Sequence, residues 1–473
     1  MSNAEIGLIG LGTMGSNLAL NIAEKGNRIA VFNRSPDKTD AFMAAAGNLK
    51  GHLLPAKTLE EFIASIRPPR PVILMVNAGT PVDEQIVVLR KLMARDDIII
   101  DAGNANFRDT MRRFKELEGS GLTYIGMGVS GGEEGARHGP SIMVGGSPES
   151  YARVEKVLTA IAARYNDEPC CAWLGPNGAG HFVKTIHNGI EYADMQMIAE
   201  IYGVLRDGVG LAPKAIGDVF AKWNRGKLNS YLIEITAAVL KADDPKTGKP
   251  MVDVIVDSAG QKGTGRWSVI ESQMMGIPAT AIEAAVAARS LSAMRVERGL
   301  AEKLYAKLNK ARSLGDPASL IDKLELALFA GKVAAYAQGF AVLEAASKEF
   351  SWNLPMATIA RIWRAGCIIR SQFLDKIATA YEENSGLTNL LVAPAFVAMM
   401  QDATPALRHI VARGAQDALP LPALSSALAY FDSYRQARGT ANLIQAQRDY
   451  FGAHGFERLD SPGVFHGSWG GIQ

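Results

Sequence analysis

Cysteine is scarce in this chain, and its scarcity limits the possible chemistry. Only three cysteines occur among 473 residues, at positions 170, 171 and 367. An odd and sparse set provides no disulfide framework and is typical of a reducing compartment. We therefore expect Cys170, Cys171 and Cys367 to be small buried apolar residues rather than redox centres, in a cytoplasmic protein.

An excess of one charge and long unbroken apolar runs are also missing. The 50 lysines and arginines nearly balance 48 aspartates and glutamates, for a formal net charge of +2, so composition gives no support to nucleic-acid binding. No basic leader precedes the apolar run at 6–11, and Gly10 and Gly12 interrupt it. The longest apolar helical stretch, 326–343, carries Lys332, so we predict no membrane span.

What the chain does contain is ordinary for a globular protein, in three parts. Hydrophobic residues make up 48% and charged residues 21%, and the length is enough for two or more domains. Strand and helix patterns alternate over 1–178, helical patterns fill 179–435, and a different segment covers 436–473. We predict an α/β domain with a Rossmann-type, doubly wound parallel sheet, then a large all-α domain and a C-terminal tail.

The first residues have the pattern of a dinucleotide site. A predicted strand at 5–9 is followed by Gly10-Leu11-Gly12-Thr13-Met14-Gly15, a predicted helix at 16–25 and a second strand at 28–32. In this context a GxGxxG sequence is informative. Gly10 permits the tight turn, Gly12 lets the backbone approach a pyrophosphate, and Gly15 lets helix and strand pack closely. The pyrophosphate would rest on the N-terminus of the helix.

The residues after the second strand favour NADP over NAD. An NAD site usually places an acidic residue there to bind the ribose 2′-hydroxyl, whereas this chain has Asn33-Arg34-Ser35. The planar guanidinium of Arg34 can pair with a 2′-phosphate, and Asn33 and Ser35 add hydrogen-bonding groups without a repelling charge. The alternative is a surface arginine in a turn, since Pro36 follows closely.

Three loops should lie at the ligand-binding edge of the predicted sheet. Strand-like runs at 72–76, 98–101 and 123–126 precede Asn77-Ala78-Gly79, Gly103-Asn104 and a Gly-rich run at 128–135. Ligands of doubly wound sheets gather at these carboxyl ends of strands. Ser130-Gly131-Gly132 could expose successive N–H groups to a carboxylate, although a plain flexible loop is the alternative.

One helical stretch, 180–192, carries four polar side chains on a single stripe. Lys184, His187, Asn188 and Glu191 follow the spacing i, i+3, i+4, i+7 and fall within an arc of roughly 100°. Lys184 and Glu191 lie two turns apart, a rise of about 10 Å, so they suit a ligand a few carbons long better than a direct ion pair. The alternative is an ordinary surface helix with a solvated polar stripe.

Three further features belong to the helical region and the tail. The segment 257–267 combines glycines with two cations, Lys262 and Arg266, and suits either a phosphate-gripping loop or a plain turn, with Arg289 on the next helix. Trp223-x-x-Gly226 with Ser230 resembles Trp363-x-x-Gly366 with Ser371, which suggests a duplicated helical unit. The Gly-rich tail should be ordered only against another surface, such as a second subunit.

Assembled, these residues resemble the 6-phosphogluconate dehydrogenase family over essentially the whole chain. The matching motifs are the GxGxxG turn and the segments 33–35, 130–137, 180–192, 260–265, 367–371 and 447–454. The resemblance implies NADP-dependent oxidation of the C3 hydroxyl of 6-phosphogluconate, loss of C1 as carbon dioxide, and formation of ribulose 5-phosphate in the pentose phosphate pathway. It implies no metal.

The resemblance also implies catalytic roles for Lys184, Glu191, His187 and Asn188. Lys184 would take the hydroxyl proton as hydride leaves, which an amine can do only when burial or a neighbouring cation lowers its pKa. Protonated Lys184 would then stabilise the developing enolate oxygen, and Glu191 would protonate C1 of the enediol. His187 and Asn188 would contact the substrate hydroxyls.

The ligand contacts that the resemblance implies fall into two groups. The cofactor contacts are Gly10, Leu11, Gly12, Thr13, Met14, Gly15, Asn33, Arg34, Ser35, Val76, Asn77, Ala78 and Asn104. The substrate contacts are Asn104, Ser130, Gly131, Gly132, His187, Asn188, Tyr192, Lys262, Arg289, Arg448 and His454, and the cations among them suit a 6-phosphate. In the family the tail residues come from the partner subunit, so the resemblance implies a homodimer whose Arg448 and His454 reach the partner's site.

Some positions depart from the family pattern. Asn77 stands where many members have lysine, which removes a cation near the cofactor and could weaken affinity for NADP or relax its preference. Thr13, Ser35 and Arg266 are conservative changes for the roles proposed.

Two rival functions remain open from the sequence. A simpler β-hydroxyacid dehydrogenase would use the same nucleotide domain, but it gives no reason for Glu191 together with Lys262, Arg289 and Arg448. A non-catalytic NADPH sensor would not need Lys184 and Glu191.

Overall fold

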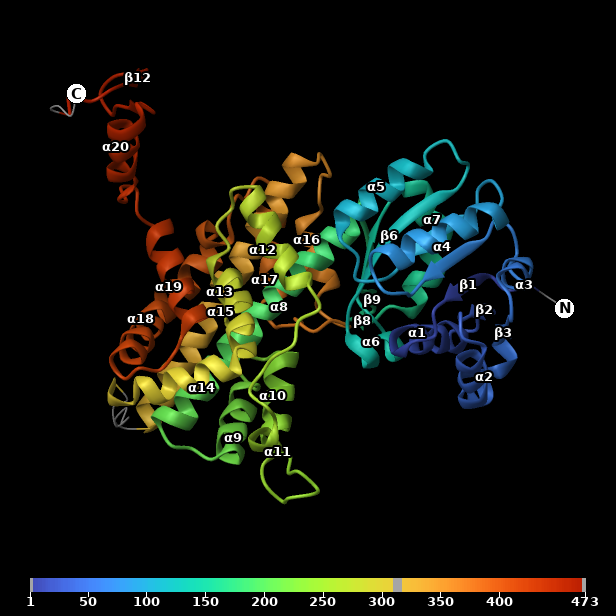
Figure 1. Ribbon diagram of the computed structural model, residues 1–473, viewed down its shortest axis with the longest axis horizontal. Coiled ribbons are helices and arrows are strands. Elements are labelled where there is room, and N and C mark those ends of the chain that lie inside the picture. Colours follow the sequence, from blue (N-terminus) through green and yellow to red (C-terminus); the bar gives the residue numbers. More distant parts are fainter. Residues whose placement is uncertain (1–2, 309–316, 470–473) are drawn as a thin grey trace.

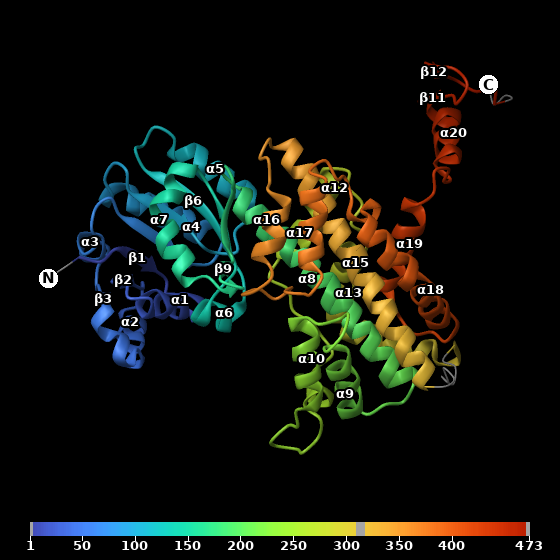
Figure 2. The same cartoon turned by 180° about the vertical axis from the view of Figure 1, so that it is seen from behind.

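The computed structural model describes residues 3–308 and 317–469. An eight-stranded sheet with flanking helices forms the N-terminal part, and a body of helices follows (Figure 1). Seen from both sides, the two parts lie next to each other and the C-terminal segment stands off the helical body (Figure 2). The predicted order, a Rossmann-type sheet and then a large helical part, is confirmed. The domain boundaries at 178 and 435 stay predictions.

The sheet has the strand order β10-β7-β6-β5-β4-β1-β2-β3. Its strands are β1 (Ile6–Ile9), β2 (Ile29–Phe32), β3 (Leu53–Pro55), β4 (Pro71–Leu74), β5 (Ile98–Asp101), β6 (Thr123–Val129), β7 (Ile142–Gly145) and β10 (Cys171–Gly175). Its helices are α1 (Thr13–Glu24), α2 (Pro36–Ala45), α3 (Leu59–Ala64), α4 (Thr80–Leu92), α5 (Phe107–Leu117), α6 (Gly132–His138) and α7 (Pro148–Ile161). The strands are almost wholly buried, as expected when helices cover both faces.

The sheet differs from the predicted one because it is not wholly parallel. Strand β7 pairs antiparallel with β6, and β10 pairs parallel with β7, so both run against the other strands. A parallel return needs a crossover that lies along the sheet, usually a helix. Here β6 and β7 are joined through the seven-residue helix α6, and the chain reverses instead. The runs that form β3, β7 and β10 were not predicted as strands.

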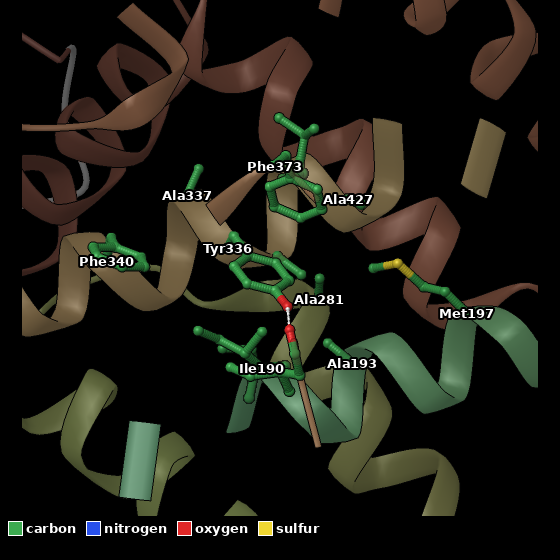
Figure 3. Packing of buried hydrophobic residues seen from close by; sticks show 14 of the residues in the cluster. Ile190, Ala193, Met197, Ala281, Tyr336, Ala337, Phe340, Phe373 and Ala427 are labelled. Atoms are coloured by element: carbon green, nitrogen blue, oxygen red, sulfur yellow. Dashed lines mark hydrogen bonds between the residues drawn. The ribbon is translucent and has the colours of Figure 1, made fainter. Parts of the chain in front are cut away.

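The helical part is built around two long helices that pack together, α8 (Ala179–Gly203) and α15 (Pro317–Glu349). Around them lie α9 (Pro213–Trp223), α10 (Tyr231–Lys241), α11 (Met251–Val254), α12 (Thr264–Met274), α13 (Thr280–Ala293), α14 (Arg295–Leu304), α16 (Met356–Ile362), α17 (Leu374–Glu383), α18 (Pro394–Gln416) and α19 (Pro422–Tyr434). Figure 3 shows the centre of this core, where Ile190 and Ala193 of α8 face Tyr336 of α15. Tyr336 donates its hydroxyl proton to the Ile369 carbonyl at 2.7 Å.

Helix α15 is the one described helix that is long and apolar enough to cross a membrane by length and composition. Within residues 318–349, however, 89% of the apolar window is buried inside the protein. Its apolar character is therefore explained by its position in the core.

The two similar tryptophan-containing segments meet in space. An antiparallel bridge pairs Ser230 with Ser371. The Tyr231 N–H donates to the Arg370 carbonyl at 3.2 Å, and the Gln372 N–H donates to the Asn229 carbonyl at 3.2 Å. A duplicated helical unit stays a hypothesis, but its two proposed copies contact each other at matching positions.

The C-terminal segment has more internal structure than its composition predicts. It contains α20 (Ala441–Gly452) and a hairpin of β11 (Phe456–Glu457) and β12 (Val464–Phe465). The Asp449 carboxylate accepts hydrogen bonds from the Gly467 N–H at 2.8 Å and the Trp469 indole at 2.7 Å, and it also contacts His466. These donors, with the Gly467 N–H first, hold the pKa of Asp449 well below its usual range. The segment thus has hydrogen bonds of its own, and the idea that the Gly-rich tail is ordered only against another surface stays a prediction.

Candidate active site

Glycines let helix α8 begin directly against the sheet. A Cβ on Gly180 would lie 2.5 Å from the Met143 carbonyl oxygen and 2.6 Å from that of Gly126. A Cβ on Gly128 would lie 2.5 Å from the Cβ of Lys184. Because these positions lack side chains, the helix approaches the backbone of β6 and β7 closely. Lys184 is thereby placed beside the carboxyl end of β6.

The polar stripe of α8 is buried, so the alternative of a solvated surface stripe was wrong. Lys184 is 6% exposed and His187 is fully covered. The Lys184 amine donates to Asn188 Oδ1 at 2.6 Å and to Ser130 Oγ at 3.3 Å, and it lies 3.3 Å from His187 Nδ1. The second ring nitrogen of His187 lies 3.2 Å from Ser130 Oγ. Lys184 therefore contacts neutral groups, and no ion pair of it occurs within the described residues.

Burial changes the protonation of this cluster. It lowers the pKa of Lys184, and the negative charge of Glu191 opposes that change. Burial, and then the neighbouring Lys184, hold the pKa of His187 well below its usual range. A lysine with a lowered pKa carries a free electron pair more often, which is what a general base requires. The neutral imidazole can orient the amine and the serine by hydrogen bonding.

Glu191 is shifted in the sense that suits a proton donor. Burial raises the pKa of its carboxyl, Lys184 and Arg289 lower it, and Asp194 raises it. Its Oε2 lies 3.9 Å from His187 Nδ1. A carboxyl that keeps its proton more strongly than usual can deliver it to a reacting carbon. One helix thus presents an amine favoured as a base and a carboxyl favoured as an acid, two turns apart.

Two residues to which the sequence analysis gave no role close the site from the helical part. The Trp363 ring meets the His187 ring edge to face at 5.5 Å, and the Cys367 thiol donates to the Trp363 carbonyl at 3.0 Å. The intervening Gly366 accepts a hydrogen bond from the Ser141 N–H at 2.7 Å. The repeated tryptophan and the segment 367–371 were visible in the sequence, but nothing there indicated which side chains they would meet.

Part of the predicted phosphate end is assembled in one chain. The Arg289 guanidinium lies 3.5 Å from the centre of the Tyr192 ring, and it donates to the Gly260 carbonyl at 3.4 Å. A Cβ on Gly265 would lie 2.4 Å from the Tyr192 ring, so the first turn of α12 is packed against α8. Lys262 is exposed in the loop that precedes α12.

The two predicted tail contacts are not brought to this site by their own chain. Arg448 and His454 are exposed on the segment that stands off the helical body (Figure 1). Arg448 donates to Gln445 Oε1 at 3.0 Å, and the His454 ring packs against Phe451. Both contacts stay within the tail.

The residues at the start of the sheet fit a dinucleotide. Gly10 has φ of +103°, and a Cβ on Gly15 would lie 1.8 Å from the Gly10 carbonyl oxygen, so both positions require glycine. A Cβ on Gly12, at the N-terminus of α1, would meet nothing within 4 Å, and no side chain caps that terminus. The Leu11 N–H donates to Asn33 Oδ1 at 3.0 Å, which ties this loop to the next. An open, uncapped helix N-terminus is suited to a pyrophosphate.

The remaining predicted contacts lie along the same edge of the sheet. Thr13 and Met14 lie in the first turn of α1, and Arg34 and Ser35 are exposed after β2. Val76, Asn77 and Ala78 follow β4, and the exposed Asn104 follows β5. Ser130, Gly131 and Gly132 follow β6, with φ of +100° and +63° at the two glycines. The predicted cofactor positions and the predicted substrate contacts Asn104 and 130–132 thus lie along one edge, as the topology requires.

Comparison with known proteins identifies the family. Residues 5–175 match the model of the NAD binding domain of 6-phosphogluconate dehydrogenase, and residues 180–469 match that of its C-terminal domain. The chain belongs to the 6-phosphogluconate dehydrogenase family. A solved Plasmodium falciparum 6-phosphogluconate dehydrogenase, described in apo form and in complex with NADP+ and with 6-phosphogluconate, is 42% identical with a TM-score of 0.94. The alignment covers 98% of this chain and 100% of that one.

Two relatives from Bacillus subtilis (strain 168) bear on the cofactor. The NADP(+)-dependent decarboxylating 6-phosphogluconate dehydrogenase is 48% identical over 470 residues, covering 99% of this chain and 100% of the relative. The NAD(+)-dependent enzyme is 48% identical over 465 residues, covering 98% and 99%. Because overall identity is the same, it does not distinguish between the two cofactors.

Proposed function

We propose that this protein oxidises and decarboxylates 6-phosphogluconate to ribulose 5-phosphate and carbon dioxide, with reduction of NADP. One observation carries the proposal. A buried lysine with neutral partners and a buried glutamate lie two turns apart on a helix that contacts the carboxyl edge of a dinucleotide-binding sheet. The family and the named activities of the relatives support the substrate and the cofactor.

NADP, when bound, supplies the acceptor for the hydride from C3. The loop Gly10–Gly15 would hold its pyrophosphate, and Asn33, Arg34 and Ser35 would hold its 2′-phosphate. Val76, Asn77 and Ala78 would contact it from the neighbouring strand, next to Asn104. These positions fit the group because the glycines leave room for it and the helix terminus is uncapped.

Lys184 would act twice in this reaction. As a neutral amine it takes the proton of the C3 hydroxyl while the hydride leaves C3, which forms a 3-keto acid. The bond between C1 and C2 then breaks, carbon dioxide leaves, and its electron pair moves towards the C3 oxygen. The ammonium of Lys184 now stabilises that oxygen and returns the proton, which gives an enediol.

Glu191 would complete the reaction from the other end of the stripe. Its protonated carboxyl donates a proton to C1 of the enediol, the carbon that was C2 before decarboxylation. The oxygen-bound proton is released as the ketone forms. The two-turn separation of Lys184 and Glu191 matches a substrate that reacts at two different carbons.

The other predicted residues would bind the sugar acid. Ser130, Gly131 and Gly132 would hold the carboxylate end, and Asn104, His187 and Asn188 would contact hydroxyls. Tyr192, Lys262 and Arg289 would hold the 6-phosphate, where cations suit a dianion.

We further propose a homodimer in which the tail completes the partner's site. The tail exposes large apolar side chains, among them Leu443, Ile444, Phe451 and Leu459. Exposed apolar side chains gathered on one segment are typical of a surface that another protein covers. The tail also carries two of the predicted substrate contacts, Arg448 and His454, away from its own site.

Mixing two inactive variants tests the exchange of tails. Lys184→Met and Arg448→Met would each be inactive alone, but a mixed dimer has one site with Lys184 from one chain and Arg448 from the other. Refolding equal amounts together should restore about a quarter of wild-type activity, because half of the dimers are mixed and each has one intact site. No restored activity, with mixed dimers shown by mass spectrometry, would contradict tail exchange.

A cytoplasmic location belongs to the same proposal. Cys170, Cys171 and Cys367 are all free and buried, and free thiols are typical of a reducing compartment. Cell fractionation with an activity assay tests this location, and activity confined to an extracellular or membrane fraction would contradict it.

Initial rates test the catalytic proposal. NADP and NAD should each be tried with 6-phosphogluconate and with 3-hydroxyisobutyrate, and release of carbon dioxide should be measured alongside. We expect equal amounts of NADPH and carbon dioxide from 6-phosphogluconate. Turnover of hydroxyisobutyrate without carbon dioxide would indicate a simpler hydroxyacid dehydrogenase, and no turnover at all would contradict an enzyme.

A further inference from the structure

Two neighbouring loops with predicted ligand contacts lie against each other. One follows β4 and contains Val76, Asn77, Ala78 and Gly79; the other follows β5 and contains Gly103 and Asn104. A Cβ on Gly103 would lie 3.1 Å from the Val76 carbonyl oxygen. Neither loop has regular secondary structure, and Gly79 has φ of +88°. Their conformations therefore have to be fixed by contacts from behind the site.

The Arg113 guanidinium makes that contact with the first loop. Arg113 lies on α5 and is 1% exposed. Its Nη2 donates to the Gly79 carbonyl at 3.0 Å, its Nε donates to Asp83 Oδ1 at 2.7 Å, and its Nη1 donates to Asp101 Oδ2 at 3.3 Å. A planar guanidinium directs its hydrogen bonds rigidly, so the acceptors are held at fixed positions relative to one another.

Asp101 links Arg113 to the second loop by hydrogen bonds. Its Oδ1 accepts a hydrogen bond from the Gly103 N–H at 3.2 Å, and its Oδ2 accepts one from the Tyr124 hydroxyl at 2.9 Å. Asp101 and Tyr124 are buried. Each oxygen of the carboxylate has a donor, so its orientation is fixed. The backbone of Gly103, next to Asn104, is thereby tied to Arg113.

Stability alone does not explain this arrangement. A buried ion pair can often be replaced by apolar side chains without loss of stability, so the core does not require one here. Two of the contacts run instead to the backbone of two loops at the ligand edge. The adjacent Arg112 differs, since it makes ion pairs with Asp83, Asp109 and Glu116 and none of its contacts reaches the backbone of either loop.

We propose that Arg113 is a positioning residue that sets the placement of the cofactor loop 76–78 relative to the substrate contact Asn104. It acts through the Gly79 carbonyl on one side and through Asp101 and the Gly103 N–H on the other. The identity of the two ligands rests on the proposed function. Because one guanidinium holds both loops, its loss weakens the binding of NADP and of 6-phosphogluconate together.

Steady-state kinetics of four variants test this role, with NADP varied at several fixed concentrations of 6-phosphogluconate. Arg113→Met removes the guanidinium, and Arg113→Lys keeps the charge without the fork. Arg113→Met with Asp101→Asn removes both buried charges, so that this variant folds even if the single one does not. Arg112→Met is the matched control on the exposed face of the same helix.

We expect Arg113→Met and the double variant to raise KM for both ligands by on the order of tenfold, with a smaller change in kcat. Arg113→Lys should be intermediate, and Arg112→Met should resemble the wild type. A double variant that melts at a lower temperature with both KM values unchanged would overturn the proposal, since only a structural role would remain. A change in KM for a single ligand would also overturn it.

Failure of the proposed function would be seen separately. If the wild type forms no NADPH from 6-phosphogluconate, the function fails, whatever the variants do. The Kd for NADP, measured by calorimetry on the same proteins, then decides whether Arg113 places the loop. A weaker Kd in the double variant supports the role, and an unchanged Kd rejects it.

Discussion

Two lysines are buried in the described part of this protein, and they differ in what surrounds the amine. Lys332 on α15 donates to both carboxylate oxygens of Asp194 on α8, at 2.6 and 2.5 Å. Lys184, also on α8, donates to an amide oxygen and a hydroxyl. Both amines are buried in the same helical part, but only Lys332 has a carboxylate as its hydrogen-bond partner.

The difference shows how one helix carries both a structural and a reactive site. A carboxylate in direct contact stabilises an ammonium ion, so Lys332 and Asp194 form an ion pair between the two central helices. The hydrogen-bond partners of Lys184 are neutral, and burial lowers the pKa of Lys184 although the charge of Glu191 opposes it. The absence of an adjacent carboxylate, and not burial alone, favours Lys184 as a base.

Removal of the reactive lysine should have the largest effect. We expect Lys184→Met to lower kcat for NADPH formation by about a thousandfold, because His187, the other base beside Ser130, has a pKa well below its usual range and is a much weaker base. Melting temperature should change little, since the amine has no ionic partner to leave behind. Activity within about tenfold of the wild type would contradict the role of Lys184 as the base.

Removal of the structural lysine should act on stability instead. Lys332→Met leaves Asp194 as an unpaired buried charge, and we expect it to lower the free energy of unfolding by about 3–5 kcal/mol in urea denaturation. A second change, Asp194→Asn, should recover most of that loss. If Lys332→Met were as stable as the wild type, the two lysines would not differ as described.

The acid at the other end of the stripe should affect a later step. Glu191→Gln should lower steady-state kcat by about a hundredfold while a first turnover of NADPH persists in rapid mixing, because protonation of C1 follows oxidation. Lys184→Met should show no such burst. An equal loss of the burst in both variants would reject the division of roles, and so would equal insensitivity of both.

A carboxylate placed beside Lys184 would make it resemble Lys332. Asn188→Asp puts a negative charge where Lys184 now meets an amide at 2.6 Å, which should raise the pKa of the amine. The base must be neutral, so kcat/KM falls as the pH drops through the pKa of Lys184. The acid limb of the pH profile of kcat/KM should therefore move to higher pH by about 1–3 units in this variant. Asn188→Leu is the control, which should lower the rate without moving the limb upwards. An unmoved limb in Asn188→Asp would show that another group titrates.

The exposed Arg34 is a third cation to compare with the two buried lysines, and its removal should have the smallest effect. Arg34 loses little hydration in the free protein, so it can bind a phosphate without the cost of burial. Arg34→Ala should raise KM for NADP by about tenfold and leave KM for NAD nearly unchanged. An unchanged ratio of the two KM values would remove Arg34 from the choice of cofactor and leave it as a surface residue.

The features that could be predicted from sequence depend on neighbours in the chain. The turn at Gly10 and the close contact at Gly15 are local, so the GxGxxG pattern was enough to place them. The stripe with Lys184 and Glu191 follows from helical periodicity. That the stripe is buried could not be read from the helix itself, because the cover comes from β6 and from the segment around Trp363.

The features that could not be predicted depend on distant pairs. Lys332 and Asp194 are 138 residues apart, and neither has a sequence pattern that identifies its partner. The contact of Arg113 with Gly79 and the direction of β7 are of the same kind, since each depends on how the sheet is assembled. The hydrogen bonds within the C-terminal segment could not be predicted either, because one carboxylate, Asp449, accepts them from donors along the segment.

Direct titration of Lys184 tests the central claim. Carbon NMR of lysine labelled at Cε would follow each buried amine with pH, with Lys184→Met and Lys332→Met used to assign the two signals. We predict that Lys184 titrates below the ordinary lysine range and at the same pH as the acid limb of kcat/KM. A titration at or above the ordinary range, or one that does not coincide with that limb, would contradict Lys184 as the base.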